Sequence, residues 1–152
     1  MVIYLTEISA IKTGFFPIPI LEGLIPAGFP SPAGDYLEPS INLEDYVTDH
    51  PNATYCVKVT GDSMAGIGIS SGDMLIIDKA LSPASGDIVV AVLNGDFTVK
   101  EFQKMGTRIS LVPHNPKFKT IIISEGDQLE IWGVVTAAIK DYKKRSVHGR
   151  NR

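Results

Sequence analysis

The chain has 152 residues, a formal net charge of −3 and 44% hydrophobic residues, which is typical of one soluble globular domain and excludes a disordered protein. The charge is uneven, because residues 1–139 carry eight basic and sixteen acidic side chains. A body with this net charge of −8 repels the phosphates of nucleic acid, so direct sequence-specific DNA binding is not an expected function.

Residues 1–44 differ from the rest of the chain in composition. Six of the ten prolines fall between positions 17 and 39, and several glycines lie among them. Proline removes backbone hydrogen-bond donors and glycine raises the entropy cost of ordering, so we expect an extended N-terminal arm. The apolar side chains of this arm are too many for a free linker, which indicates that it lies in a groove of the body or of a partner. Residues 41–47 predict one short helix that begins near Asn42.

From residue 53 onward the sequence predicts strands. The pair Asn94-Gly95 lies between two β runs and predicts a tight hairpin, because both turn residues must adopt positive φ. We therefore expect residues 45–142 to form a mainly β body, with about seven strands in curved antiparallel sheets. Apolar alternation and apolar runs between turn signals predict these strands at residues 54–60, 73–78, 87–93, 97–102, 108–112, 120–123 and 129–139.

Several features bear on the compartment. The single cysteine, Cys56, cannot form an internal disulfide and alternates within a strand pattern, so a buried structural thiol in a reducing compartment is expected. The first residues carry Glu7 in an apolar run and lack a cationic start, so they do not predict a signal peptide. No stretch of about 18 apolar residues exists, so we expect a cytoplasmic protein without a membrane span. The basic tail, residues 143–152, is expected to be solvated.

One serine occupies a position suited to chemistry. Ser63 lies in the Gly-Asp-Ser-Met turn of residues 61–64, directly after the first predicted strand of the body. A serine hydroxyl becomes a good nucleophile only when a neighbouring base takes its proton. The three histidines, His50, His114 and His148, lie in polar loops or in the tail, so each is interpreted as a surface residue rather than as this base.

Lysine is the other possible base. A neutral amine accepts a proton well, but its pKa must fall from about 10.4 toward 7, at a cost of roughly 4 to 5 kcal/mol, and desolvation on an apolar β surface lowers the pKa in this way. Lys100 lies in the second strand of the predicted hairpin, on one face with Thr98 and Phe102. By pattern alone Lys100 is more often an exposed strand residue and Ser63 a turn residue, so only their combination suggests a catalytic pair.

A set of motifs carries a family resemblance. Each motif is weak alone, but together they resemble the self-cleaving serine–lysine peptidases of the LexA type. Within that family they are similar to the UmuD-type branch, the accessory subunits of error-prone translesion polymerases. The resemblance covers roughly residues 15–142. Its motifs are Ala-Gly-Phe-Pro-Ser-Pro-Ala at 27–33, Asp-Tyr at 35–36, His-Pro-Asn-Ala-Thr-Tyr at 50–55, Gly-Asp-Ser-Met at 61–64, Gly-Ile-Ser-Ser-Gly-Asp-Met-Leu-Ile-Ile-Asp at 68–78, Gly-Asp-Ile-Val-Val-Ala at 86–91 and Asn-Gly-Asp-Phe-Thr-Val-Lys at 94–100.

The resemblance implies a reaction and its residues. Ser63 is expected to be the nucleophile and Lys100 the general base, and their separation of 37 positions matches the serine–lysine spacing of the family. The implied substrate is the chain's own arm, cut between Ala27 and Gly28. Backbone amides, those of Ser63 and Asp62, are the expected oxyanion donors.

Two small-residue pairs in the arm need comparison. The UmuD-type branch carries Cys-Gly at its cut site, whereas this chain has Ala27-Gly28, like the LexA-type Ala-Gly. A second pair, Ala33-Gly34, lies six residues on, in a context similar to the sequence that the family leaves uncut. The tail after Lys143 lies outside the resemblance, and its role is left open.

The resemblance also implies partners. We expect a homodimer, a RecA filament on single-stranded DNA that stimulates the cut, and a Y-family DNA polymerase subunit of the UmuC type that the shortened dimer activates. No metal and no cofactor are expected. The alternative function is a non-catalytic dimeric binding module that regulates a polymerase. A signal-peptidase-like enzyme would need a membrane anchor, and a repressor would need a helix-turn-helix domain before the body. Cleavage in cis and in trans both remain open.

Overall fold

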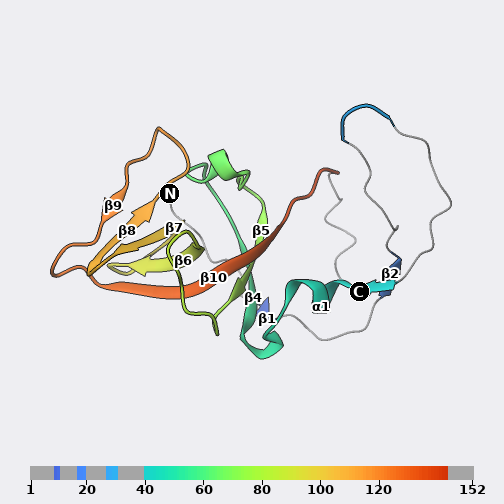
Figure 1. Ribbon diagram of the computed structural model, residues 1–152, viewed down its shortest axis with the longest axis horizontal. Coiled ribbons are helices and arrows are strands. Elements are labelled where there is room, and N and C mark those ends of the chain that lie inside the picture. Colours follow the sequence, from blue (N-terminus) through green and yellow to red (C-terminus); the bar gives the residue numbers. More distant parts are fainter. Residues whose placement is uncertain (1–8, 11–16, 20–26, 31–39, 144–152) are drawn as a thin grey trace. The chain divides into compact units, whose positions relative to one another are not determined.

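The structure is a computed structural model that describes residues 9–10, 17–19, 27–30 and 40–143 (Figure 1). The chain divides into two compact units, Met1–Ile11 with His50–Arg152 and Lys12–Asp49. The larger unit contains an antiparallel sheet in which β10 pairs with both β5 and β6. Its strands, in the order of the sheet, are β1 (Ser9–Ala10), β4 (Thr54–Lys58), β5 (Met74–Asp78), β10 (Leu129–Ile139), β6 (Ile88–Leu93), β7 (Asp96–Met105), β8 (Arg108–Val112) and β9 (Ile121–Ile122).

This sheet confirms the predicted mainly β fold. Seven of its strands lie where the sequence predicts them, and β1 is an additional edge strand that pairs with β4. The predicted hairpin is confirmed as well, since Asn94 has a φ of 51° and Gly95 a φ of 90°. This turn joins β6 to β7 in a register that sets Val89 opposite Lys100.

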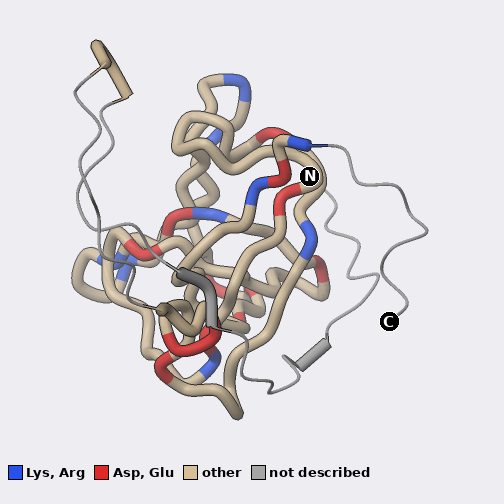
Figure 2. The backbone as a smooth tube through the Cα atoms, turned by 90° about the vertical axis from the view of Figure 1, so that its right-hand side faces the viewer, with Lys and Arg blue, Asp and Glu red and all other residues tan. Residues whose placement is uncertain are grey.

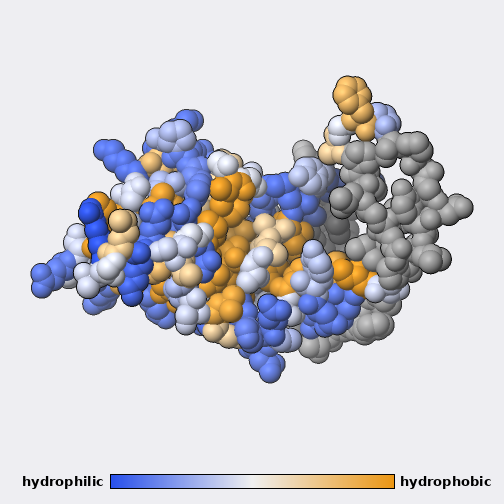
Figure 3. Space-filling view, viewed as in Figure 1, coloured by the Kyte–Doolittle hydropathy of each residue, from blue (hydrophilic) through white to orange (hydrophobic). Residues whose placement is uncertain are grey.

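The core lies on both faces of the sheet. Strand alternation assigns neighbouring residues to opposite faces, and accordingly Val90 and Val99 belong to one apolar cluster while Val89 and Phe102 belong to another. Apolar side chains also reach the surface of this unit between charged ones (Figure 3). The exposed large apolar residues there are Ile67, Leu81, Met105, Ile122, Ile139 and Tyr142.

We expect Leu75→Ala to lower the free energy of unfolding by about 2 to 5 kcal/mol. Leu75 in β5 is fully buried in the first cluster, so truncation leaves a cavity that its neighbours cannot fill. Leu81→Ala is the matched control, because the Leu81 side chain is already exposed. Urea unfolding of both variants tests this, and equal losses of stability would contradict the burial of Leu75.

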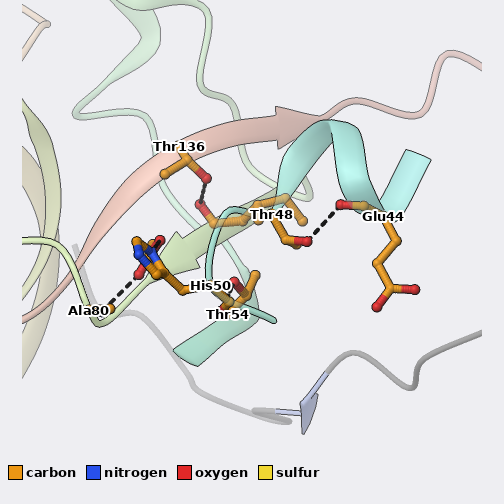
Figure 4. Close-up of polar contacts among 8 residues, drawn as sticks. Glu44, Thr48, His50, Thr54, Ala80 and Thr136 are labelled. Atoms are coloured by element: carbon orange, nitrogen blue, oxygen red, sulfur yellow. Dashed lines mark hydrogen bonds and ion pairs between the residues drawn. The ribbon is translucent and has the colours of Figure 1, made fainter. Parts of the chain in front are cut away.

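Two short turns of 3-10 helix border the strands of the larger unit: η1 (Pro51–Ala53) precedes β4, and η2 (Ala65–Ile67) follows it. At η1 the Thr54 hydroxyl donates a 2.7 Å hydrogen bond to the His50 carbonyl (Figure 4). The N–H of Ala80 donates to Asp78 Oδ1 in the same region, at the end of β5. The first bond fixes the chain on entry to β4, and the second fixes it on exit from β5.

The smaller unit contains a two-stranded antiparallel sheet, β2 (Pro17–Pro19) with β3 (Ser40–Asn42), and the helix α1 (Leu43–Val47). The Asn42 side chain accepts a hydrogen bond from the Glu44 N–H and caps α1. The predicted helix is therefore present, but it begins at Leu43 because residues 41–42 pair in β3.

Residues 27–30 are exposed. Three expectations fall outside the described residues: the uncut pair Ala33-Gly34, the histidine His148 and the tail from residue 144 onward. Within the part of the chain that the structure describes, no helix is long and apolar enough to cross a membrane.

Candidate active site

The turn that carries Ser63 is held at its base and closed by glycines. The Val59 N–H donates to the Asp73 carbonyl, and the Gly72 N–H donates to the Val59 carbonyl. These two hydrogen bonds hold the two ends of the loop after β4 together. Gly61 has a φ of 93°, which favours glycine because a side chain would clash with the backbone in this conformation. Within the loop, the side chain of Ser63 is fully buried.

A charged pair supports this loop from the end of β10. The Lys140 ammonium binds the Asp73 carboxylate, which also accepts the Ser70 N–H. Burial raises the pKa of Asp73, but the hydrogen bonds from Lys140 and Ser70 and the charge of Lys140 together outweigh burial. The pKa of Asp73 is therefore below its usual range. Figure 2 shows the lysines and arginines interspersed with acidic residues along the described chain.

Lys100 extends from β7 to the Ser63 hydroxyl. Its Nζ lies 3.0 Å from Ser63 Oγ, 2.7 Å from Thr98 Oγ1 and 3.0 Å from the carbonyl oxygen of Val99. Only 4% of Lys100 is exposed. Strand alternation explains the contact with Thr98, since residues two apart in β7 share a face.

Burial changes the proton affinity of this amine. Desolvation lowers the pKa of Lys100 from 10.5 to about 8, because a low-dielectric site disfavours the ammonium ion. This shift corresponds to about 3 kcal/mol of destabilisation of the charged form. Among the described residues no carboxylate forms an ion pair with Lys100, so no negative charge there offsets the effect of burial on its pKa.

The three neighbours of Nζ fit either of its two protonation states. A neutral amine has two N–H bonds and one lone pair, whereas an ammonium ion has three N–H bonds and no lone pair. The Val99 carbonyl can only accept, and the Thr98 hydroxyl accepts the second N–H of the neutral amine. The lone pair is then directed at Ser63, so the neutral form of Lys100 can receive the serine proton.

The other residues singled out in the sequence lie elsewhere. Ala27 and Gly28 lie in the smaller unit and are exposed, and Asp62 is exposed beside Ser63. His50 Nδ1 pairs with Asp78 Oδ2 at 2.6 Å, and His114 Nε2 pairs with Glu101 Oε2 at 2.5 Å. Both rings thus bind carboxylates.

Sequence reasoning missed two contacts of the site. Thr98 was assigned to the face of Lys100 but given no role, although the alternation of the strand pointed to their contact. The segment Pro113–Asn115 was interpreted as a surface loop, yet its main chain contacts the Ser63 turn: the His114 N–H donates to the Ser63 carbonyl at 2.9 Å. No local pattern signals a contact between residues 51 positions apart.

A cavity of about 350 Å³ opens beside the pair. Lys100 and Thr98 form part of its wall. Its apolar wall is formed by Leu93, Phe97, Phe118 and Ile121. A cavity with apolar and polar walls next to a buried amine is suited to side chains of a bound peptide.

The chain is similar to known proteins over most of its length. A family model described as Peptidase S24-like matches residues 19–136. Protein SamA of Salmonella typhimurium is 47% identical over 128 residues, which cover 84% of this chain and 87% of that protein. Protein MucA of Escherichia coli is 40% identical over 126 residues, 82% of this chain and 86% of that protein. The LexA repressor of Bordetella avium is 34% identical over 122 residues, 80% of this chain and 57% of that protein.

Proposed function

Because this chain belongs to the peptidase S24-like family, we propose that it is a serine endopeptidase that cuts its own N-terminal arm between Ala27 and Gly28. Ser63 is the nucleophile and Lys100 the general base. The observation that carries this proposal is the 3.0 Å contact between Ser63 Oγ and a buried Lys100 Nζ. The pKa of Lys100, lowered to about 8 by burial, supports it further, because a useful base titrates near the working pH.

The broader role follows from the family. The chain is a UmuD-type protein of the serine peptidase family with a function in the SOS response to DNA damage. A purely non-catalytic binding module is not favoured. In the proposed role, a RecA filament on single-stranded DNA stimulates the cut, and the shortened homodimer assists a polymerase subunit of the UmuC type.

The proposed reaction proceeds in two steps. Neutral Lys100 takes the proton of Ser63, and Ser63 Oγ attacks the carbonyl carbon of Ala27 while the N–H groups of Ser63 and Asp62 stabilise the oxyanion. The lysine proton then passes to the amine of Gly28, and the bond between Ala27 and Gly28 breaks. A water molecule, deprotonated by Lys100, hydrolyses the ester that remains on Ser63.

The bond chosen for cleavage suits this site. Ala27 is small and fits a narrow pocket, and Gly28 lets the chain pass close to the serine. Both residues are exposed, as a segment that must enter an active site requires. The cavity beside Lys100 provides room for the larger side chains that flank the bond.

We expect the rate of self-cleavage to rise about tenfold between pH 7 and pH 10, with a midpoint near pH 8. With the pKa of Lys100 lowered to about 8, roughly one tenth of the molecules carry a neutral amine at pH 7 and nearly all do at pH 10. Mass spectrometry after incubation at each pH measures the fragment that begins at Gly28. A pure binding module would give no fragment at any pH, which would refute the proposed activity.

A further inference from the structure

We propose that His114 and Asn115 are positioning residues for self-cleavage, because they set the orientation of the peptide groups around Ser63. The Pro113–Asn115 segment follows β8 directly, and we call it the clamp. This inference rests on the self-cleavage proposed above. No residue of the clamp is proposed to contact the substrate.

The clamp binds the main chain of the Ser63 turn at both ends. The His114 N–H donates to the Ser63 carbonyl at 2.9 Å, and the His114 carbonyl accepts the Gly66 N–H at 2.6 Å. The Asn115 Nδ2 donates to the Asp62 carbonyl at 2.9 Å. Three hydrogen bonds thus fix residues 62–66, which include Ser63 and the first two residues of η2.

The packing between the clamp and the turn is close. A Cβ atom built on Gly66 would overlap the carbonyl oxygen of His114. Glycine is therefore required at this position by close approach of two backbones rather than by its own φ. The main chains of the turn and the clamp are in direct contact, so a shift of one moves the other.

The bond from Asn115 bears directly on the oxyanion site. The carbonyl of Asp62 and the N–H of Ser63 belong to one peptide unit, and in a planar trans unit they point in opposite directions. The Asp62 carbonyl accepts from Asn115 Nδ2 and also from the Ala65 N–H at 3.1 Å, and its direction toward Asn115 aims the Ser63 N–H away from the clamp. The Ser63 N–H is one of the two proposed oxyanion donors, and such donors act only when they are oriented before the reaction.

The side chain of His114 connects the clamp to the strand that carries the base. Its Nε2 pairs with Glu101 Oε2, and Glu101 is the neighbour of Lys100 in β7. Gln103 also donates to Glu101, and these two hydrogen bonds lower the pKa of Glu101. The carboxylate stays ionised as an acceptor for His114. One residue thus joins the serine turn to the lysine strand.

The test compares first-order self-cleavage rates of the full chain between pH 7 and pH 10. Asn115→Asp keeps the shape and the acceptor for the Lys117 N–H but loses the donor to Asp62. We expect a 10- to 100-fold lower rate at every pH, an unchanged pH midpoint and an unchanged thermal unfolding midpoint. Asn52→Asp, an exposed asparagine of η1, is the matched control and should cut at the normal rate.

A second pair of variants tests the connection to β7. His114→Ala should cut about tenfold more slowly, and His114→Gln should recover most of the rate because its amide can donate to Glu101. Rates of Asn115→Asp within twofold of the unchanged chain would overturn the inference. So would a loss fully explained by unfolding at the assay temperature, or His114→Gln as slow as His114→Ala. If the unchanged chain gives no fragment, the proposed peptidase activity itself fails.

Discussion

Ser63→Ala and Lys100→Ala each lower the rate of self-cleavage at pH 9 by at least about 10³-fold. The first variant removes Ser63 Oγ, the atom proposed to attack Ala27. The second leaves the serine without its base, since Lys100 Nζ is the amine that contacts Ser63 Oγ. Because the two residues act as a unit, the double variant should be no slower than either single variant. Gel densitometry of the fragment over time measures all three rates.

Matched substitutions separate this effect from general damage to the fold. Ser71→Ala alters an exposed serine of the same loop, and Lys104→Ala alters an exposed lysine of the same strand, β7. Both should cut at the normal rate. Cleavage at full rate in Ser63→Ala would show that another group or a contaminating protease makes the fragment.

At pH 7, Lys100→Met removes the penalty of about 3 kcal/mol that the buried amine imposes on the free energy of unfolding, against the loss of the three hydrogen bonds of Lys100 Nζ, and it abolishes cleavage. The folded chain holds the Lys100 amine where burial lowers its pKa to about 8 from the ordinary 10.5, and this shift corresponds to that free energy. Methionine has a similar length and no charge to desolvate. Urea unfolding of the two proteins at pH 7 measures the difference.

The free energy of unfolding of Lys100→Met relative to the unchanged chain should fall by about 3 kcal/mol between pH 7 and high pH. Between pH 8 and 10.5 the unfolded chain binds the Lys100 proton while the folded chain does not, so the stability of the unchanged protein rises with pH across this window. Above pH 10.5 both states carry a neutral amine, and the cost is gone. Lys104→Met, an exposed substitution in β7, should show no such pH dependence. A constant difference at all pH values would contradict the lowered pKa.

The sequence predicts most of the sheet because its strands carry strong local signals. β10 was predicted with its observed bounds, since residues 129–139 form a long apolar run between turn signals. The Asn94-Gly95 turn was predicted because few residue pairs accept two positive φ values. In contrast, β1 has two residues, too few for any periodicity, and only its pairing with β4 defines it.

The site could be predicted in part. The resemblance indicated Ser63 and Lys100 as a pair, and the structure brings their side chains within 3.0 Å. Pattern alone favoured an exposed Lys100, because burial of a strand lysine depends on distant residues that cover it. The clamp could not be predicted either. His114 binds the serine turn through its main chain, and a main-chain contact does not depend on the type of residue.

The central place of β10 determines when Ser63 and Lys100 can come together during synthesis. Ser63 follows β4 in one half of the sheet, Lys100 lies on β7 in the other half, and β10 joins the halves by pairing with β5 and β6. The ribosome makes the arm first and β10 last among the described strands. A nascent chain therefore carries the bond between Ala27 and Gly28 long before the two halves can be joined. If the proposed self-cleavage takes place, the arm is protected from it until translation has passed residue 139.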